Sequence, residues 1–134
     1  MNPQDIHWPA VFVAALSTFL IGGLWYSPVL FAKPWMTLNG FTQERLREAN
    51  MAAIFGGSFV LSLVIATNLA FFLGKQATVT FGVAAGLAAG LGWVTASTGI
   101  TYLFERRPLK LLLINGGYHV VAYTVMGAIL GAWH

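Results

Sequence analysis

The chain has 134 residues, of which 57% are hydrophobic and 8% are charged, with a formal net charge of +3. Soluble domains carry about 25% charged residues, so this chain has too little charge to cover a water-exposed surface. It contains no cysteine, which excludes disulfides and a cysteine nucleophile. The composition therefore predicts an integral membrane protein whose partner is the lipid bilayer and not nucleic acid.

Four stretches are long and apolar enough to cross a bilayer. A hydrocarbon core about 30 Å thick needs roughly 20 apolar residues per helix. The stretches that meet this requirement are residues 8–26, 51–73, 77–104 and 109–133. The first lacks a basic leading segment and a small-residue cleavage site, so we expect it to be retained and not removed as a signal peptide. The predicted fold is all-α, with residues 1–134 forming a single transmembrane domain of four helices.

The longest connection, residues 27–50, is expected to have structure of its own. Pro28 should end the first helix, and the apolar residues 29–36 suit an interfacial or re-entrant segment, two alternatives that stay open. Thr42 is of the type that caps a helix N-terminus, here one beginning at Gln43. If that helix continued into the second span it would be about 45 to 50 Å long and would extend beyond the bilayer.

Basic residues predict the orientation, because short cytoplasmic loops collect Lys and Arg. Six of the seven basic residues flank or occupy the first and third connections: Lys33, Arg45, Arg47, Arg106, Arg107 and Lys110. The second connection has only Lys75. We therefore expect both termini on the periplasmic or extracellular side of the inner (plasma) membrane.

An internal repeat is also indicated. Residues 54–60 read IFGGSFV and residues 114–120 read INGGYHV, which share the pattern I-x-G-G-x-x-V. Each would belong to the second helix of a hairpin, and the two tandem hairpins would have the same orientation. This is the pattern of a parallel repeat about an axis along the membrane normal. Glycine and aliphatic residues are abundant, so chance similarity is the alternative.

Small residues predict close helix packing in the last two spans. Gly82, Gly86 and Gly90 are spaced by four and share one helix face, and Gly127 and Gly131 form a similar pair. Such faces let neighbouring backbones approach closely. Packing within one chain and packing across a homo-oligomer interface are both compatible with this pattern.

Polar residues inside the spans are the candidate binding or pathway residues. Asn115, His119 and Tyr123 follow i, i+4, i+8 spacing and form one stripe, and Asn68 is the other strongly polar residue at depth. His119 has three open interpretations. It is a neutral imidazole bonded to a neighbouring helix, a proton-relay or solute-binding group, or a metal or haem ligand.

The remaining chemistry argues against an enzyme. The four carboxylates belong to Asp5, Glu44, Glu48 and Glu105, all in loops or chain ends, and no phosphate-binding loop or H-E-x-x-H motif occurs. We expect no cofactor and no metal. Asp5, His7 and His134 come from termini on one side, where we expect disorder in preference to a metal site.

Several motifs resemble those of the family known as domain of unknown function 1761, small bacterial integral membrane proteins. They are GGLWYSPVLF at 22–31, followed by Lys33 and Trp35-Met36, and then YLFERRPL at 102–109, LINGGYH at 113–119 and VMGAILG at 125–131. The resemblance implies four transmembrane helices and brings no activity with it. Asp is frequent in the family where this chain has Asn115, a departure that weakens any proton-linked or cation-linked role.

Two functions are compatible with these features. The first is a non-enzymatic homo-oligomer whose polar stripe in the fourth helix lines a passage for a small solute or ion. The second is a structural or accessory subunit that packs against a larger membrane complex through its glycine faces. A membrane-embedded enzyme or haem carrier is a third alternative.

Overall fold

A computed structural model describes residues 2–134, and in this range the chain consists of helices and their connections. Four helical segments are long and apolar enough to cross a membrane, which confirms the predicted spans. The first, second and fourth spans are single helices, whereas the third span is interrupted by an irregular turn. Their bounds are α1 (Trp8–Trp25), α4 (Met51–Leu73), Val79–Glu105 and α7 (Leu109–Ala132).

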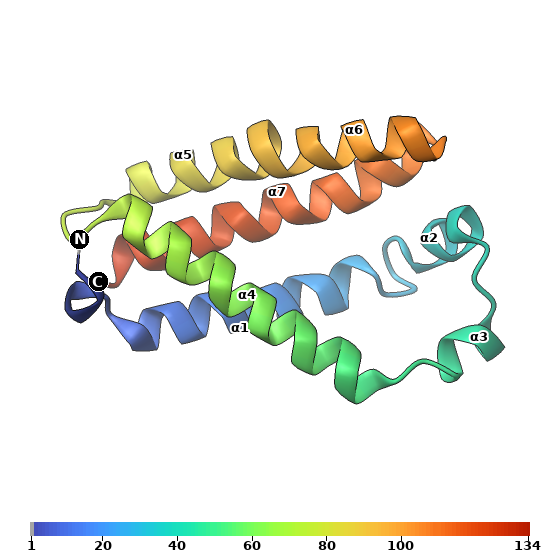
Figure 1. Cartoon of the computed structure of the whole chain (residues 1–134), viewed down its shortest axis with the longest axis horizontal. Coiled ribbons are helices and arrows are strands. Elements are labelled where there is room, and N and C mark those ends of the chain that lie inside the picture. Colours follow the sequence, from blue (N-terminus) through green and yellow to red (C-terminus); the bar gives the residue numbers. More distant parts are fainter. Residues whose placement is uncertain (1) are drawn as a thin grey trace.

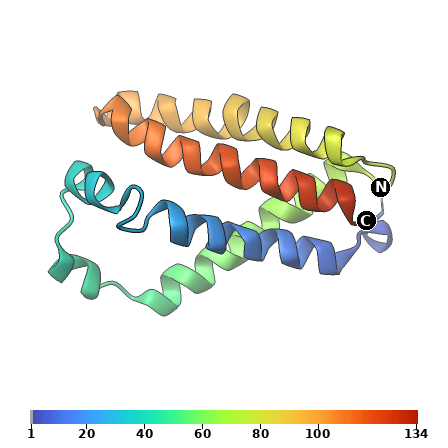
Figure 2. The same cartoon turned by 180° about the vertical axis from the view of Figure 1, so that it is seen from behind.

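The α7 helix lies between α1 and the third span, and both chain ends lie at the same end of the molecule (Figure 1). We call this the terminal end, and the opposite end, which carries the long connection, the loop end. The view from behind shows α7 in front, with α4 crossing behind it (Figure 2). The polypeptide therefore crosses from end to end four times, as the hydropathy predicted.

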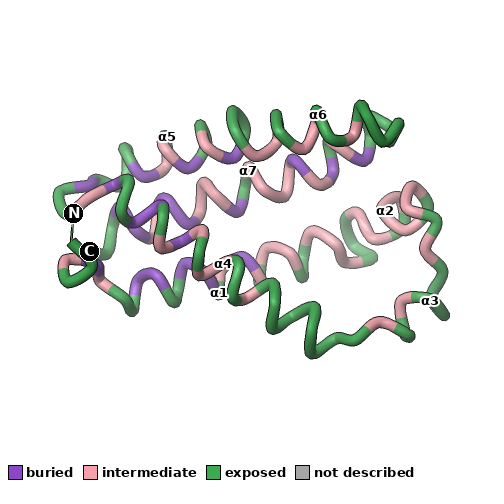
Figure 3. The backbone as a smooth tube through the Cα atoms, viewed as in Figure 1, coloured by how far each residue is buried: buried purple, intermediate pink, exposed green. Residues whose placement is uncertain are grey.

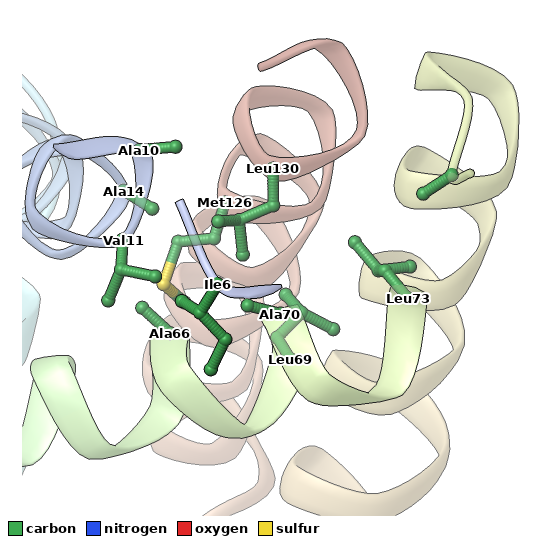
Figure 4. Close-up of a cluster of buried hydrophobic side chains, with 11 residues drawn as sticks. Ile6, Ala10, Val11, Ala14, Ala66, Leu69, Ala70, Leu73, Met126 and Leu130 are labelled. Atoms are coloured by element: carbon green, nitrogen blue, oxygen red, sulfur yellow. The ribbon is translucent and has the colours of Figure 1, made fainter. Parts of the chain in front are cut away.

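The apolar core is concentrated at the terminal end. Ile6 precedes α1 and packs with side chains from α1, α4 and α7, including Val11, Ala66 and Met126 (Figure 4). Ala10, Ala14 and Ala66 are fully buried, so these helices approach with little side chain between them. Ile6 therefore packs onto the bundle, where the sequence had suggested a disordered N-terminus, while residues 2–4 are exposed.

The loop-end half of α4 is exposed. All residues from 51 to 58 are exposed, whereas the buried residues of the same helix all lie in its terminal-end half (Figure 3): Ala66, Leu69, Ala70 and Leu73. In Figure 1 α4 diverges from α5 and α6 toward the loop end. The two copies of the I-x-G-G-x-x-V pattern therefore have different surroundings, and the repeat stays a prediction.

The long connection forms two short helices, α2 (Ala32–Asn39) and α3 (Gln43–Arg47). Gly40 ends α2 in a left-handed conformation with φ of 70°, which suits a residue without a side chain. Thr42 caps α3 as predicted, since its hydroxyl accepts a hydrogen bond from the Arg45 amide at 3.1 Å.

The α3 helix does not continue into the second span. It ends at Arg47, and α4 starts afresh after Asn50, whose side chain accepts a hydrogen bond from the Ala53 amide at 3.1 Å. The expected alternative of one continuous helix of 45 to 50 Å is therefore wrong. The second N-cap explains the break, because a capping side chain stabilises a helix start at that position.

The third span consists of α5 (Val79–Ala89), a π-helical turn η2 (Gly90–Thr95) and α6 (Ala96–Glu105). The Thr95 hydroxyl donates to the Gly90 carbonyl at 2.7 Å, and it lies 3.2 Å from the Gly116 carbonyl of α7. These contacts link the turn to α7. Turns of this kind occur mostly as single-turn bulges and frequently at functional sites.

Candidate functional site

The α5 and α7 helices pack backbone against backbone through the predicted glycines. A Cβ added to Gly82 would overlap the Gly127 carbonyl, and one added to Gly131 would overlap the Thr78 carbonyl. A Cβ on Gly86 would overlap the carbonyl of Tyr123. All five predicted packing glycines lie where the third span, through α5 and the first residue of η2, meets α7 within one chain: Gly82, Gly86, Gly90, Gly127 and Gly131. The glycines thereby hold α7, and its polar stripe, in one position beside the third span.

The two motif regions around residues 22–28 and 113–119 pack directly against each other. The Trp25 indole donates a hydrogen bond to the Ile114 carbonyl at 2.8 Å. The same ring lies over Gly117, where an added Cβ would be 2.9 Å from the indole. Glycine at 117 therefore makes room for the tryptophan, and the first motif is joined to the last helix. We call this region the motif contact.

Asn115 lies at the centre of the motif contact. Its amide oxygen accepts a hydrogen bond from the Tyr26 hydroxyl at 2.8 Å, and its amide nitrogen donates to the Tyr102 hydroxyl at 2.7 Å. Tyr26 follows α1, Tyr102 lies in α6, and Asn115 lies in α7. One amide therefore connects three of the four spans near the loop end.

Hydrogen bonds continue from the motif contact toward α4. The Tyr118 hydroxyl donates to the Thr18 carbonyl at 3.1 Å, and its ring lies against Gly22. The Thr18 hydroxyl is 3.1 Å from the hydroxyl of Ser62 in α4. This series of polar groups lies on the side of α7 that faces α1.

His119 and Tyr123 occupy the next two turns of the stripe that begins at Asn115. The His119 ring packs edge-on against Tyr118 and Tyr123, with centroids 5.1 and 6.5 Å away. Within residues 2–134 the imidazole makes no hydrogen bond, and its nitrogens are not sealed from the surroundings. His119 is therefore a half-buried polar group with free hydrogen-bonding capacity.

A cavity of about 530 Å³ lies between α4, the third span and α7. Tyr123 and Asn68 line it together with Trp93 of the π-helical turn, and the rest of its wall is aliphatic or aromatic. No charged side chain from the described part of the chain lines it. We call this space the α4 cavity.

Two of the four predicted pathway residues thus meet in one cavity. Asn68 and Tyr123 line the α4 cavity, His119 lies one turn away on the same face of α7, and Asn115 is held in the motif contact. The amide of Asn68 also donates to the Val64 carbonyl of its own helix at 2.8 Å. The stripe therefore leads from the motif contact toward the cavity.

The sequence alone did not single out the tyrosine partners of Asn115 or the role of Trp25. Trp25, Tyr26 and Tyr102 stand in the motifs at 22–31 and 102–109, but the sequence assigned them no partners. A signal existed, because both tyrosines are near the loop end of their spans, at the depth that Asn115 occupies in the fourth span. Their distances to Asn115 depend on the helix crossing angles, which hydropathy does not predict.

The terminal end carries the ion pair of Asp5 and Lys75, whose charged atoms are 2.7 Å apart. The hydrogen bond from Lys75 lowers the pKa of the Asp5 carboxyl below its usual value. His134 contacts the Ala77 carbonyl at 2.6 Å, and the His7 ring packs against Trp133. Asp5, His7 and His134 therefore each have a separate neighbour, and no group of three ligands that could hold a metal occurs among residues 2–134.

Four apolar spans, with polar groups paired between helices, define a multi-pass membrane protein. The model of the family described as protein of unknown function (DUF1761) matches residues 9–131. The chain belongs to this family, as its motifs had suggested. Neither a curated protein nor a solved structure matches the chain.

Proposed function

We propose that this protein is a non-enzymatic, homo-oligomeric passage for a small uncharged solute in the inner membrane, with both termini outside. The observation that carries the proposal is the polar face of α7, on which Asn115, His119 and Tyr123 lead from the motif contact to the α4 cavity. Polar residues inside a membrane usually face protein or a water-filled space, because exposure to lipid is costly.

The lining favours an uncharged solute over an ion. The α4 cavity is bordered by apolar side chains and by the neutral groups of Asn68, Trp93 and Tyr123. An ion in such surroundings would lose its hydration without gaining an opposite charge. The bond network of Asn115 with Tyr26 and Tyr102 closes the loop end of this path, so passage requires these bonds to open.

The oligomer is supported by the exposed half of α4. Phe55 and Ile54 are about half exposed, and an added Cβ at Gly56 or Gly57 would meet nothing within 4 Å. A helix face of this kind can receive a neighbouring helix closely. A second copy of the chain would cover this exposed half of α4.

Reconstitution into liposomes tests the passage. Stopped-flow light scattering would measure entry of glycerol and urea, with a potassium-leak assay as the ionic comparison. We expect faster entry of the neutral solutes than in protein-free vesicles, no potassium leak, and a several-fold decrease with His119→Leu. Ser97→Ala, an exposed change on the third span, is the matched control. Wild-type vesicles as tight as empty ones, or an unchanged rate with His119→Leu, would refute the passage.

The same exposed half of α4 supports a second candidate, an accessory subunit of a larger membrane complex. Native mass analysis of the protein extracted in mild detergent separates the two. A species containing only copies of this chain supports the passage. A second polypeptide in fixed stoichiometry, lost in Gly57→Leu but kept in Gly23→Ala, supports the accessory role.

A further inference from the structure

The α4 cavity contains hydrogen-bonding groups that the described residues leave unused. Asn68 uses one N–H for the Val64 carbonyl, so its amide oxygen and second N–H are free. The Tyr123 hydroxyl and the Trp93 indole N–H have no hydrogen-bond partner within residues 2–134. In a bilayer no bulk water supplies partners, so these groups require them from whatever occupies the cavity.

The occupant must also match the shape and polarity of the walls. The cavity has a volume of about 530 Å³, within the range of small-molecule sites, and mostly apolar walls. Phe72, Trp93 and Tyr123 are its aromatic lining residues, and Phe72 and Trp93 are 60% and 68% exposed, so the cavity is open to the side. A flat ring between aromatic side chains and an apolar chain along the aliphatic wall would fill this space.

The free groups determine the polar chemistry of the ring. They offer three donors, namely the Asn68 N–H, the Trp93 N–H and the Tyr123 O–H, and two acceptors, the oxygens of the Asn68 amide and the Tyr123 hydroxyl. Carbonyl oxygens are the complementary acceptors, and the absence of charged lining residues from the described chain requires a neutral molecule. Trp93 and Tyr123 are near the middle of their spans, a depth that the ester carbonyls of a lipid anchored by a charged headgroup do not reach.

We propose that the α4 cavity binds a prenylquinone, a neutral ring with carbonyl oxygens on an apolar chain, which enters sideways from the bilayer. Binding involves no covalent or redox step. The proposal goes beyond the solute passage and does not require transport, although both use Tyr123.

Tryptophan fluorescence of the full chain in lipid nanodiscs, titrated with decylubiquinone, tests this. We expect saturable quenching in the wild type and about a tenfold weaker affinity in the double variant Asn68→Leu, Tyr123→Phe, which loses two hydrogen bonds. Thr101→Val is the matched control, since in the described part of the chain its hydroxyl bonds only to its own helix, and Thr101 does not line the cavity. Circular dichroism checks that each variant is folded.

A ligand control isolates the role of the carbonyls. Decylbenzene has a similar apolar body without them, and we expect it to compete at least tenfold less well than decylubiquinone. Equal competition, or unchanged quenching in the double variant, would overturn the proposal. The solute flux is measured separately, so binding without flux would refute only the passage, and flux without binding only the quinone site.

Discussion

Asn115 uses both ends of its amide, one for the Tyr26 hydroxyl and one for the Tyr102 hydroxyl. A side chain that satisfies two neighbours at once is costly to remove, because each neighbour then loses its partner inside the membrane. Asn115, the first residue of the polar stripe, therefore has a structural role. His119 and Tyr123 are the residues of the stripe whose polar groups remain available to bind a ligand.

Asn115→Leu should lower the free energy of unfolding by about 1 to 3 kcal/mol, since two tyrosine hydroxyls lose their partner. Unfolding by sodium dodecyl sulfate, followed by circular dichroism, measures the change. Asn68→Leu is the matched control and should have little effect, because among residues 2–134 its amide bonds only to its own helix. Equal losses in the two variants would contradict the role assigned to Asn115.

Asp5 should make the terminal end sensitive to pH. Its pKa is lowered in the folded protein by the Lys75 hydrogen bond, so the ion pair stabilises the fold above the unfolded-state pKa of about 3.9. This stability is lost as pH falls through the lower folded-state pKa.

We therefore expect the melting temperature of the wild type to exceed that of Asp5→Asn at pH 6 and the two values to converge below about pH 4. Glu44→Gln, at an exposed carboxylate without an ion pair in residues 2–134, is the control and should match the wild type at pH 6. A difference between wild type and Asp5→Asn that persists in acid would show that the contribution is not electrostatic.

Among the elements, α5 and α7 form the tightest pair, because their glycines bring backbone atoms into contact. Such a pair packs closely because glycine has no side chain to hold the two backbones apart, and not because large apolar side chains are buried between them. It follows that adding a single methyl group at the contact changes more than adding one on the same span elsewhere.

Gly86→Ala should destabilise the protein by about 1 to 3 kcal/mol, the usual cost of overpacking, because the new Cβ would overlap the Tyr123 carbonyl. Gly92→Ala lies on the same span with nothing within 4 Å and should be neutral or slightly stabilising. Detergent unfolding curves compare the two. If Gly86→Ala left the free energy of unfolding unchanged, α5 and α7 would be able to move apart without loss of stability.

The sequence predicted the elements well and their contacts poorly. Each span could be predicted within two residues, because every backbone polar group in lipid must be bonded inside its own helix. The glycine faces were also predictable, since spacing by four defines one side. The π-helical turn at 90–95 and the break at 48–50 were not, because both depend on side-chain to backbone bonds of Thr95 and Asn50.

In the whole molecule, α4 is buried in the core at one end, while at the other it is exposed and contacts α1 through Phe55 and Phe19. Its terminal-end half contributes Ala66, Leu69 and Leu73 to the core, while residues 51–58 are exposed. The α5–α7 pair is held along its length by glycine contacts. We expect the loop-end half of α4 to vary in position relative to the third span.

Spin labels can measure this, because the natural chain has no cysteine to compete for labelling. A pair at Ser58→Cys and Leu91→Cys, across the open side, should give a broader distance distribution than a control pair at Leu87→Cys and Val121→Cys on α5 and α7. Equal widths would show that α4 is as rigidly held as α7.

The motif contact also constrains the order of assembly. Trp25 and Tyr26 bond to residues 89 positions later in the chain, at Ile114 and Asn115. During synthesis the first three spans enter the membrane before these partners exist. The hairpin of the third span and α7 has a short turn and local contacts, which form quickly. The contact between α1 and α7 can form only after α7 is in place, so folding of this protein is completed by its last helix.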